Sequence, residues 1–399
     1  MTDIPFSWLD LTLLVLALPA LAASGYLAFL TVLSKQRPAP TGAARTRFDI
    51  VVPAHNEANG IAATVASLSA LEYPAERRRI LVVADNCTDD TASRAADAGA
   101  IVLVRHHATE RGKGYALAHA YAQSLGDGFA DAIVVVDADS SVSPNLLSAF
   151  AARFEGGALA LQAEYGVRNA NESWRTRLMV IALTMFHTVR SLGRERLHLS
   201  CGLRGNGMAF SADLVRRVPQ RAFSLVEDVE YGIALGLQGI RVEYVHEASV
   251  LGDMPTTASA AQTQRERWEG GRIAMLRAHL PPLLGAARRT RSAVPVDLAL
   301  DLLVPPLTTL GAMIVVGLGL STLAVTQSDS GRYGLLAWCT CAAFIALYLI
   351  RGIILSGTGF RAIRDLLWLP VFVLWKLTAS LRPRGRSGEW VRTPRADER

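Results

Sequence analysis

Positive charge is missing from the first 34 residues, where Asp3 and Asp10 are the only charged side chains. A secretory signal peptide needs a positively charged n-region, so this absence excludes one. The segment Leu11–Leu33 is instead almost wholly apolar, and at about 1.5 Å per residue it is long enough to cross a hydrocarbon core of ~30 Å. The first charges after it are Lys35, Arg37, Arg45 and Arg47. The positive-inside rule therefore predicts that the chain starts outside and lies in the cytoplasm from about residue 35 onward.

Cysteine is scarce and scattered. The four residues are Cys87, Cys201, Cys339 and Cys341, and their spacing resembles no zinc set. Because a domain in the cytoplasm works in a reducing compartment, we predict no disulfide. Cys339 and Cys341 sit inside an apolar run, where we expect them to face lipid or to pack.

Nucleic-acid motifs, internal repeats and low-complexity tracts are also absent from the sequence. The net charge of +6 and the pI near 9.3 would suit a polyanionic partner. The arginines, however, concentrate beside the apolar segments, where they meet anionic lipid headgroups. We therefore expect membrane lipids, and no nucleic acid, as partners.

Apolar residues are abundant: they make up 51% of the chain, and the mean hydropathy is +0.26. These values predict membrane segments beside a sizeable globular core. A second membrane block begins near Leu298, in which Leu302–Val325 and Leu335–Leu355 are predicted to form a helical hairpin that leaves and re-enters the cytoplasm. Asp297 and Asp301 would then sit at the cytoplasmic interface.

The last apolar segment, Leu366–Leu381, is short and contains Pro370 and Lys376. A tail rich in arginine follows it. A crossing here would put that basic tail outside, against the positive-inside rule, so we predict an interfacial or re-entrant segment.

The stretch between the membrane blocks alternates strands with helices. Short Val/Ile-rich runs are followed by helical patterns, and the predicted pairs are 48–52 with 61–71, 80–83 with 91–98, and 100–104 with 114–125, before a final strand at 133–136. This alternation predicts an α/β domain with a mostly parallel sheet covered by helices on both faces. We expect four parts: a transmembrane helix in 1–34, a cytoplasmic domain in 48–296, transmembrane and interfacial helices in 297–381, and a basic cytoplasmic tail in 382–399.

Polar chemistry gathers directly after these strands. Asp137-Ala138-Asp139 closes the last strand, and two carboxylates at i and i+2 can both reach one hard divalent cation at the sheet edge where ligands bind. Pro53-Ala54-His55-Asn56-Glu57 follows the first strand, and Ala84-Asp85-Asn86 follows the second. Thr88 or Asp89 can simply cap the next helix, whereas Asp85 faces the ligand edge. Arg111-Gly112-Lys113-Gly114 adds a basic, flexible stretch before a helix, suited to an anion.

The order of these motifs resembles the family 2 glycosyltransferases, the inverting GT-A-fold group that includes cellulose, hyaluronan and poly-N-acetylglucosamine synthases. The resemblance runs over Phe48 to Arg277 and is completed by Glu227-Asp228 and by Gln264-Arg265-Glu266-Arg267-Trp268. The family pattern has Thr-Glu-Asp where this chain has Val226-Glu227-Asp228, so the first position departs from it.

The resemblance implies a role for each residue. Asp228 would be the general base that deprotonates the acceptor hydroxyl, although a helix-start carboxylate favoured by the macrodipole is the plainer interpretation. Asp85 would bind uracil, and Asp139 would bind the diphosphate mainly through Mg²⁺ or Mn²⁺. The implied donor-binding residues are Pro53, Glu57, Asp85, Lys113, Asp137, Asp139, Gln264 and Arg267. The implied acceptor-binding residues are Gly205, Asn206, Gly207, Glu227 and Trp268, with a tight strand turn as the alternative for the two glycines and a core tryptophan as the alternative for Trp268.

Trp174–Leu197 carries an apolar stripe beside several arginines. This pattern predicts an amphipathic helix, either on an anionic membrane surface or packed against the domain. His187 has no partner nearby in the sequence and receives no role.

The resemblance implies an enzyme of the inner membrane with its catalytic domain in the cytoplasm. It would transfer a sugar from a UDP-sugar to a growing polysaccharide or a lipid-linked acceptor, with secretion or assembly subunits as further partners. A single-addition lipid glycosyltransferase, resembling ceramide glucosyltransferases, is the alternative. An inactive glycan-binding assembly subunit is the alternative from another class, and the intact Asp137, Asp139, Asp228 and Trp268 argue against it.

Overall fold

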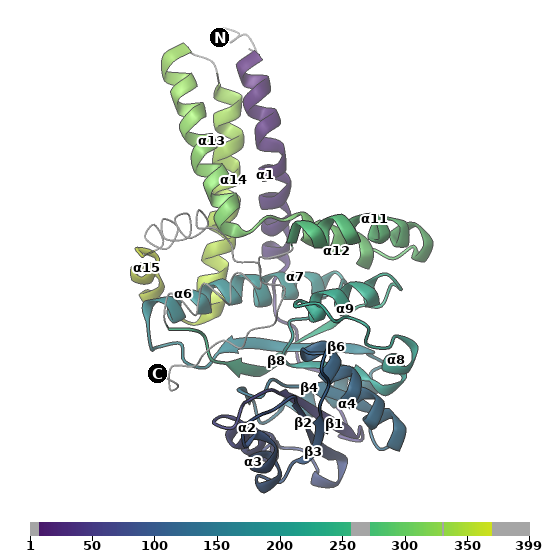
Figure 1. Cartoon of the computed structure of the whole chain (residues 1–399). Helices are drawn as coiled ribbons and strands as arrows, with labels where there is room; N and C mark the ends of the chain where they lie inside the picture. Colours follow the sequence, from purple (N-terminus) through teal and green to yellow (C-terminus); the bar gives the residue numbers. More distant parts are fainter. Residues whose placement is uncertain (1–7, 257–271, 329–330, 369–399) are drawn as a thin grey trace.

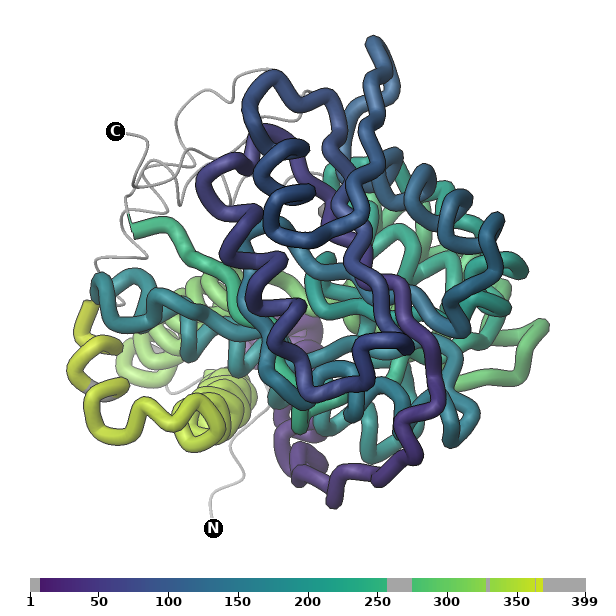
Figure 2. The backbone as a smooth tube through the Cα atoms, turned by 90° about the horizontal axis from the view of Figure 1, so that it is seen from below, coloured from purple at the N-terminus to yellow at the C-terminus, as the bar shows by residue number. Residues whose placement is uncertain are grey.

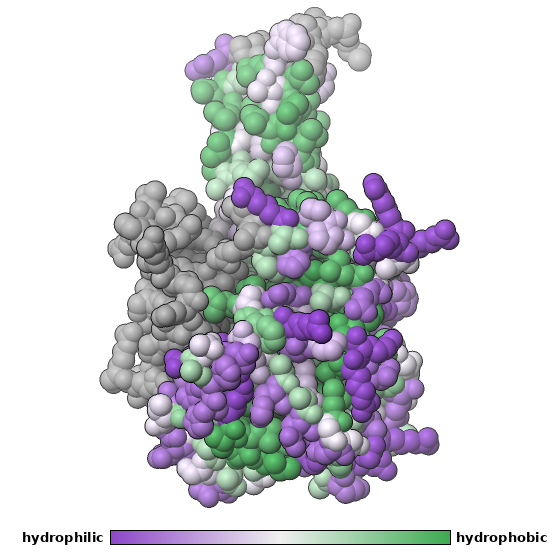
Figure 3. Space-filling view, turned by 45° about the vertical axis from the view of Figure 1, so that its right-hand side comes forward, coloured by the Kyte–Doolittle hydropathy of each residue, from purple (hydrophilic) through white to green (hydrophobic). Residues whose placement is uncertain are grey.

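The computed structural model describes residues 8–256, 272–328 and 331–368. Helices α1 (Trp8–Leu33), α13 (Leu307–Ser328) and α14 (Arg332–Ser356) stand side by side at one end, and an α/β domain forms the other end (Figure 1). All three helices are long and apolar enough to cross a membrane. Figure 3 shows hydrophobic side chains over the outside of this helical end, whereas the α/β domain presents a mainly hydrophilic surface.

The first half of the domain has the alternation that the sequence predicts. Its elements are β1 (Phe48–Ala54), α2 (Ile61–Ser69), the short 3₁₀ helix η1 (Ala75–Arg77), β2 (Arg78–Asp85), α3 (Thr91–Asp97), β3 (Ile101–Arg105), α4 (Lys113–Asp127) and β4 (Ala132–Val135). Strand β1 pairs in parallel with both β2 and β4, and β2 pairs in parallel with β3. The chain therefore reverses its direction of strand addition between β1 and β4, which is where open α/β sheets bind ligands.

The second half completes one mixed sheet of eight strands in the order β3-β2-β1-β4-β7-β6-β8-β5. Its elements are β5 (Ser141–Val142), α5 (Leu146–Glu155), β6 (Ala160–Val167), α6 (Trp174–Leu183), the π-helix η2 (Thr184–Val189), α7 (Arg190–Arg196), β7 (Met208–Ser211), α8 (Ala212–Arg217), α9 (Glu227–Gly236) and β8 (Glu243–Gly252). Strand β7 is antiparallel to its neighbours β4 and β6. The predicted fold class, an α/β domain with a mostly parallel sheet, is confirmed.

Both faces of the sheet are covered. Successive side chains of a strand point to opposite faces, so Ile50 and Val52 pack with α2 and α5 while Val51 packs with α4 on the other side. Figure 2 shows these helices wrapped around the strands when the molecule is seen from below. A strand buried on both faces needs a continuous apolar sequence, which explains the unbroken Val/Ile runs.

The segment predicted as one amphipathic helix over Trp174–Leu197 is α6, η2 and α7 in direct succession. Its arginines Arg190 and Arg194 are 4% and 1% exposed, so the membrane-surface interpretation is wrong for these two residues and the packing alternative holds. Helix α7 also lies directly against α1, because a Cβ atom added at Gly193 would stand 2.5 Å from the carbonyl oxygen of Leu30.

The buried arginines belong to a set of charged and hydroxyl side chains that we call the Arg194 network. Its members are Tyr26 on α1, Arg190 and Arg194 on α7, Asp297 and Asp301 on α12 (Val294–Leu303), and Tyr348 on α14. Arg194 contacts Asp301 at 2.6 Å and Asp297 at 3.0 Å. Arg190 lies 3.2 Å from Asp301 and donates to the Tyr348 hydroxyl at 2.9 Å. Burial disfavours the ionised form of Asp301, but Arg194, Arg190 and Arg204 outweigh it and lower the pKa of that carboxyl.

The start predicted for the second membrane segment is wrong. The expected helix Leu302–Val325 is divided, because α12 ends at Leu303 and α13 begins at Leu307. Pro305 and Pro306 cause the break, since a residue before proline is restricted to extended conformations, and Val304 has ψ 115°. The segment predicted over 335–355 lies inside α14.

Two more helices complete the described chain: α11 (Arg272–Thr290) and α15 (Arg361–Leu366). The predicted interfacial segment Leu366–Leu381 lies outside the described residues beyond Trp368, as does the tail 382–399.

We predict that Asp301→Asn destabilises the protein strongly. The substitution keeps the shape of the side chain, but it leaves Arg194 paired with Asp297 and takes away the carboxylate that Arg190 contacts. Breaking a buried charge pair costs about 3–5 kcal/mol. The midpoint of thermal unfolding in detergent should fall clearly. Asp213→Asn is the control, because Asp213 pairs with Arg217 on the exposed surface, where such pairs contribute ~1 kcal/mol or less. Equal midpoints for the two variants would contradict the prediction.

Candidate functional site

The predicted residues of the first half gather at one edge of the sheet. Pro53 lies in β1, Asp85 ends β2, Lys113 begins α4, and Asp137 follows β4. Strand β1 pairs in parallel with β2 on one side and with β4 on the other, so the carboxyl ends of the three strands lie along the same edge of the sheet. The structure therefore brings together side chains that are up to 84 positions apart in the sequence.

Lys113 is the centre of this site. Its ammonium nitrogen lies 2.5 Å from Asp137 Oδ1, donates to the Gly205 carbonyl oxygen at 2.5 Å, and lies 3.9 Å from Glu227 Oε1. Burial lowers the pKa of Lys113, but the carboxylates of Asp137, Glu227 and Asp228 outweigh it and raise that pKa overall. The lysine is therefore a fixed positive charge that joins the strand-end carboxylates to the start of α9.

The Gly205-Asn206-Gly207 turn is tied to the loop after β4. Asn206 is 1% exposed; its Oδ1 accepts from the Asp137 backbone N–H at 3.1 Å, and its Nδ2 donates to Ser140 Oγ at 2.7 Å. Gln162 on β6 donates to the Asn206 carbonyl oxygen at 2.7 Å. Gln162 and Ser140 are residues that the sequence analysis missed, and no local motif signals them.

Glu227 and Asp228 open helix α9 beside this turn. A Cβ atom built at Gly205 would stand 3.3 Å from Asp228 Oδ2 and 3.6 Å from Lys113 Nζ, so the Asp228 carboxylate lies against the turn. Burial raises the pKa of Glu227 to about 7, with Lys113 opposing the shift and Asp228 adding to it. Burial also raises the pKa of Asp228, again against Lys113. Two neighbouring carboxyl groups of raised pKa are suited to accepting a proton near neutral pH.

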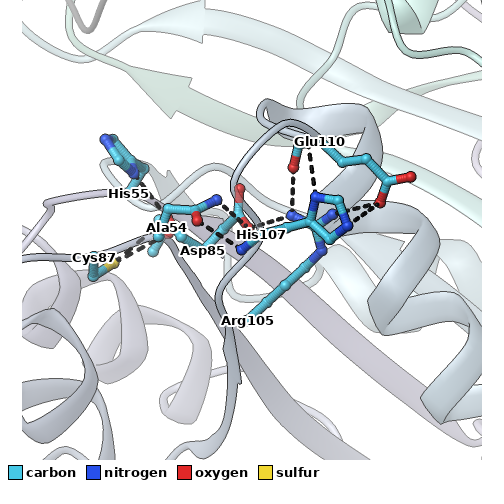
Figure 4. Close-up of polar contacts among 8 residues, drawn as sticks. Ala54, His55, Asp85, Cys87, Arg105, His107 and Glu110 are labelled. Carbon is cyan, nitrogen blue, oxygen red and sulfur yellow. Dashed lines mark hydrogen bonds and ion pairs between the residues drawn. The ribbon is translucent and has the colours of Figure 1, made fainter.

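Asp85 lies in a separate polar group at the end of β2 (Figure 4). Its Oδ1 accepts from Arg105 at 2.7 Å and from Asn86 at 3.1 Å, and its backbone oxygen lies 2.7 Å from His55 Nδ1. Arg105 also donates to Glu110. The sequence analysis missed Arg105, although Asp85 and Arg105 end neighbouring parallel strands and are partners in register.

The first two strand-end loops are joined to each other. The Glu57 backbone N–H donates to Thr91 Oγ1 at 2.8 Å, and the Thr88 N–H donates to Asn56 Oδ1 at 2.8 Å. The cap predicted at Thr88 or Asp89 is wrong, because the N-cap residue of α3 is Asp90. Asp89 lies one residue earlier and accepts from the Thr91 backbone N–H at 3.1 Å. The loop that carries Pro53 and Glu57 is thereby held beside the loop that carries Asp85.

Asp139 is the second carboxylate after β4, two residues beyond Asp137. It is half-buried and accepts from Ser140 Oγ at 3.5 Å. Within the described residues no three His, Cys, Asp or Glu side chains converge into a metal cage. Divalent cations such as Mg²⁺ are, however, often held by one or two carboxylates together with substrate phosphates. Asp137 and Asp139 offer that donor set, so the residues present fit a cation shared with a diphosphate.

Gln264, Arg267 and Trp268, which the sequence analysis assigned to donor and acceptor binding, lie outside the described residues. The described part of the site thus contains the strand-end carboxylates, Lys113, the Gly205–Gly207 turn and the two acids of α9.

The sheet is mostly parallel, has acidic loops at its carboxyl edge, and contains the antiparallel strand β7 beside β4. This is the architecture of GT-A glycosyltransferases. A solved structure agrees at the level of the fold: the mannosyltransferase PcManGT from Pyrobaculum calidifontis, determined in complex with GDP-Man and Mn²⁺, is similar with a TM-score of 0.55 and 16% identity over 86% of this chain and 99% of that one. The family model described as "Glycosyltransferase like family 2" matches residues 45–271. The chain belongs to this family.

Curated relatives match over the same region. The chain is 26% identical to the probable glycosyltransferase YdaM of Bacillus subtilis over 238 residues, 56% of this chain and 55% of that protein. It is 28% identical to the beta-monoglucosyldiacylglycerol synthase of Synechocystis over 233 residues, 56% and 47% respectively. It is 24% identical to a probable glucomannan 4-beta-mannosyltransferase of Arabidopsis thaliana over 238 residues, 56% and 42%. The chain spans about half the length of these relatives.

We predict that Gly205→Ala lowers the rate of sugar transfer by roughly tenfold or more, since displacement of reacting groups by about 1 Å can cost ~10²-fold. The added methyl group would press on Asp228 and Lys113, and the residue has φ +79°. Gly128→Ala is the matched control, because Gly128 has φ +68° but open space around the Cβ position. Equal activity losses in the two variants would mean that backbone strain, not crowding of the site, causes the effect.

Proposed function

We propose that this protein is a membrane-embedded, metal-dependent, inverting glycosyltransferase. It transfers a sugar from a nucleotide-diphosphate sugar, a UDP-sugar in the first instance, to a growing polysaccharide or a lipid-linked acceptor. The observation that carries the proposal is Lys113 placed between Asp137 on one side and Glu227 and Asp228 on the other. The Asp137 side of the site suits a diphosphate that is bound through a divalent cation, and the side with Glu227 and Asp228 suits the hydroxyl of an acceptor.

Asp228 is the proposed general base. In inverting transfer the acceptor hydroxyl attacks the anomeric carbon from the face opposite the departing diphosphate, and one base takes up the hydroxyl proton. The ionised form of Asp228 does this work. Because burial raises its pKa, the rate should increase with pH through that pKa and decrease in acid. Glu227, which is 7% exposed, lies next to Asp228 and is proposed to contact the acceptor. Its carboxyl group interacts with both Lys113 and Asp228.

Asp137 and Asp139 are the proposed residues that hold Mg²⁺ or Mn²⁺ together with the donor diphosphate. The bound cation would supply neutralising charge to the departing diphosphate. Lys113 contributes a protein charge to the same end of the site, since its ammonium group already contacts Asp137. Pro53, Glu57, Gln264 and Arg267 are proposed as further donor contacts.

Asp85 is the proposed contact for the base of the nucleotide. Its Oδ1 is occupied by Arg105 and Asn86, which leaves Oδ2 as an acceptor. A carboxylate oxygen accepts from the N–H group of uracil, and guanine offers N–H donors as well. Since the similar mannosyltransferase was determined with GDP-Man, GDP-sugars belong in any donor screen beside UDP-sugars.

A single addition to a membrane lipid is the second candidate function. Only three helices in the described residues are candidate spans, whereas a polysaccharide secretion channel needs enough helices to line a pore. The similarity to a monoglucosyldiacylglycerol synthase supports the same alternative. Gly205, Asn206, Gly207 and Trp268 are proposed to contact the acceptor in either case.

The proposed setting is the inner membrane, with the chain crossing several times. Residues 1–34 and the helices within 297–381 form the membrane part, 48–296 forms the cytoplasmic catalytic domain, and 382–399 forms a cytoplasmic tail. The α/β domain lies at the end of α1 opposite its amino terminus (Figure 1), which agrees with an external start and a cytoplasmic site. Secretion or assembly subunits are proposed only for the polysaccharide case.

The experiment that tests the function is a donor screen. Membranes containing the protein are incubated with UDP- and GDP-sugars and Mn²⁺ or Mg²⁺, and the products are separated into polymer and glycolipid. Consumption of one donor with a lengthening polymer supports the first candidate, and a single glycolipid supports the second. Donor binding without consumption of any donor would indicate the inactive assembly subunit.

We predict that Asp228→Asn lowers kcat by roughly 10² or more while the affinity for the nucleotide changes little. Asparagine keeps the shape but cannot take up a proton. Asp85→Asn is the matched comparison, and it should mainly weaken nucleotide binding. Steady-state kinetics and binding of UDP measure both effects. If Asp228→Asn turned over near the parental rate, the base assignment would move to Glu227.

We also predict that removal of divalent metal abolishes transfer. Chelator should stop the parent protein and added Mn²⁺ or Mg²⁺ should restore it, because the diphosphate then regains its counter-charge. Asp139→Ala should lose activity with an unchanged thermal unfolding midpoint, since Asp139 is half-buried and not part of the core. Full activity in chelator would exclude the metal role.

A further inference from the structure

A pocket of about 460 Å³ lies outside the proposed catalytic site, between α6 and the turn that joins α14 to α15. Figures 1 and 2 both show α15 beside α6, close to the end of α14. Its polar lining includes Arg177 on α6, Ser356 and Thr358 at the turn, and Arg361 and Asp365 on α15. The proposed glycosyl transfer uses none of these residues.

The lining carries an excess of positive charge. Arg177 Nε donates to both carboxylate oxygens of Asp365, at 3.0 and 2.9 Å, and Asp365 is 2% exposed. The two terminal nitrogens of Arg177 have no acceptor among the described residues, and neither has the exposed guanidinium of Arg361. The single acid of the lining is thus already paired with Arg177, and the remaining N–H donors are available to an anion. Arginine matches phosphate oxygens with two parallel N–H donors.

Hydroxyl groups lie beside these donors. Ser356 Oγ and Thr358 Oγ1 are 2.7 Å apart, and Ser356 Oγ donates to the Ile353 carbonyl oxygen at 2.8 Å. Both hydroxyls are half-buried at the end of α14. They suit a ligand that carries polar oxygen atoms next to its phosphate.

The surroundings of the pocket are those of a membrane interface. Helix α14, a candidate span, ends at Ser356. Phe360 and Leu367 are 90% and 75% exposed, and Trp368 stacks on Trp174 with ring centroids 5.4 Å apart. Exposed apolar side chains beside tryptophans and arginines are typical of the headgroup level of a bilayer.

We propose that this pocket binds the headgroup of an anionic phospholipid. Its phosphodiester lies between Arg177 and Arg361, the headgroup hydroxyls contact Ser356 and Thr358, and the acyl chains extend past Phe360 and Leu367. A free phosphate ion would leave those apolar side chains in water. The chain's own segment 382–399 has more basic than acidic residues, so its charge does not complement the pocket.

The test uses the full-length protein in nanodiscs that contain phosphatidylglycerol and phosphatidylcholine. Native mass spectrometry counts the lipids that stay bound after the protein is released from the nanodiscs. We expect phosphatidylglycerol to be retained in preference to phosphatidylcholine, and Arg361→Gln to weaken that retention roughly fivefold, since one arginine near an anionic headgroup contributes about 1 kcal/mol. Arg361 is exposed and unpaired in the described structure, so the variant should fold.

Arg364→Gln is the matched control. Arg364 is an exposed arginine on the same helix but does not line the pocket, and its replacement should leave retention unchanged. Equal losses in both variants would show a general effect of surface charge and overturn the proposal, as would an unchanged Arg361→Gln protein. Soluble glycerol phosphate competing as well as the lipid would identify a phosphate site instead. Retention of phosphatidylglycerol does not depend on sugar transfer. The lipid proposal and the proposed function can therefore each fail without the other.

Discussion

The buried guanidinium of Arg194 is the constraint on which the arrangement of the molecule depends. An arginine that is 1% exposed must have its charge balanced inside the protein. Asp297 and Asp301 on α12 supply that balance, and the Tyr26 hydroxyl on α1 accepts a hydrogen bond from the same guanidinium. Arg190 extends the same set to Tyr348 on α14. Helices that belong to the apolar end of the chain are thereby fixed to the layer that lies on the catalytic sheet. The paired charges add a fixed geometry to the hydrophobic contacts between these helices.

A second fixed charge organises the catalytic end. The chain has only three lysines among its 41 basic residues, and one of them, Lys113, stands between a strand-end carboxylate, a turn carbonyl and an acid of α9. A compact ammonium group fits between such oxygens, whereas the planar fork of arginine demands a different arrangement of acceptors. The Asn206 side chain then ties the same turn to the loop after β4. The groups proposed for the donor and those proposed for the acceptor therefore share one support.

Local patterns predicted the strands of the first half and the carboxylates at their ends, because a Val/Ile run and the residue after it are neighbours in the sequence. Contacts between distant segments gave no such signal: Gln162 with Asn206, and Arg194 with Asp301, depend on how β6, β7, α7 and α12 meet. The division between α12 and α13 was missed for another reason. The sequence stays apolar through Pro305 and Pro306. The length of an apolar segment therefore does not reveal the two prolines that end the helix inside it.

The contact of Gly193 with Leu30 has a geometric consequence for the substrate. The two backbones touch without a side chain between them, which fixes α7 against α1. The layer of α7, η2 and α6 in turn packs on β6 and β8 of the sheet. In the proposed membrane setting the carboxylate of Asp228, the proposed base, would then stand at one height above the bilayer. An acceptor must present its hydroxyl at that height, so reach from the lipid surface becomes a selection rule, independent of the sugar that the pocket recognises. The protein would thus select acceptors by the distance of their hydroxyl group from the membrane.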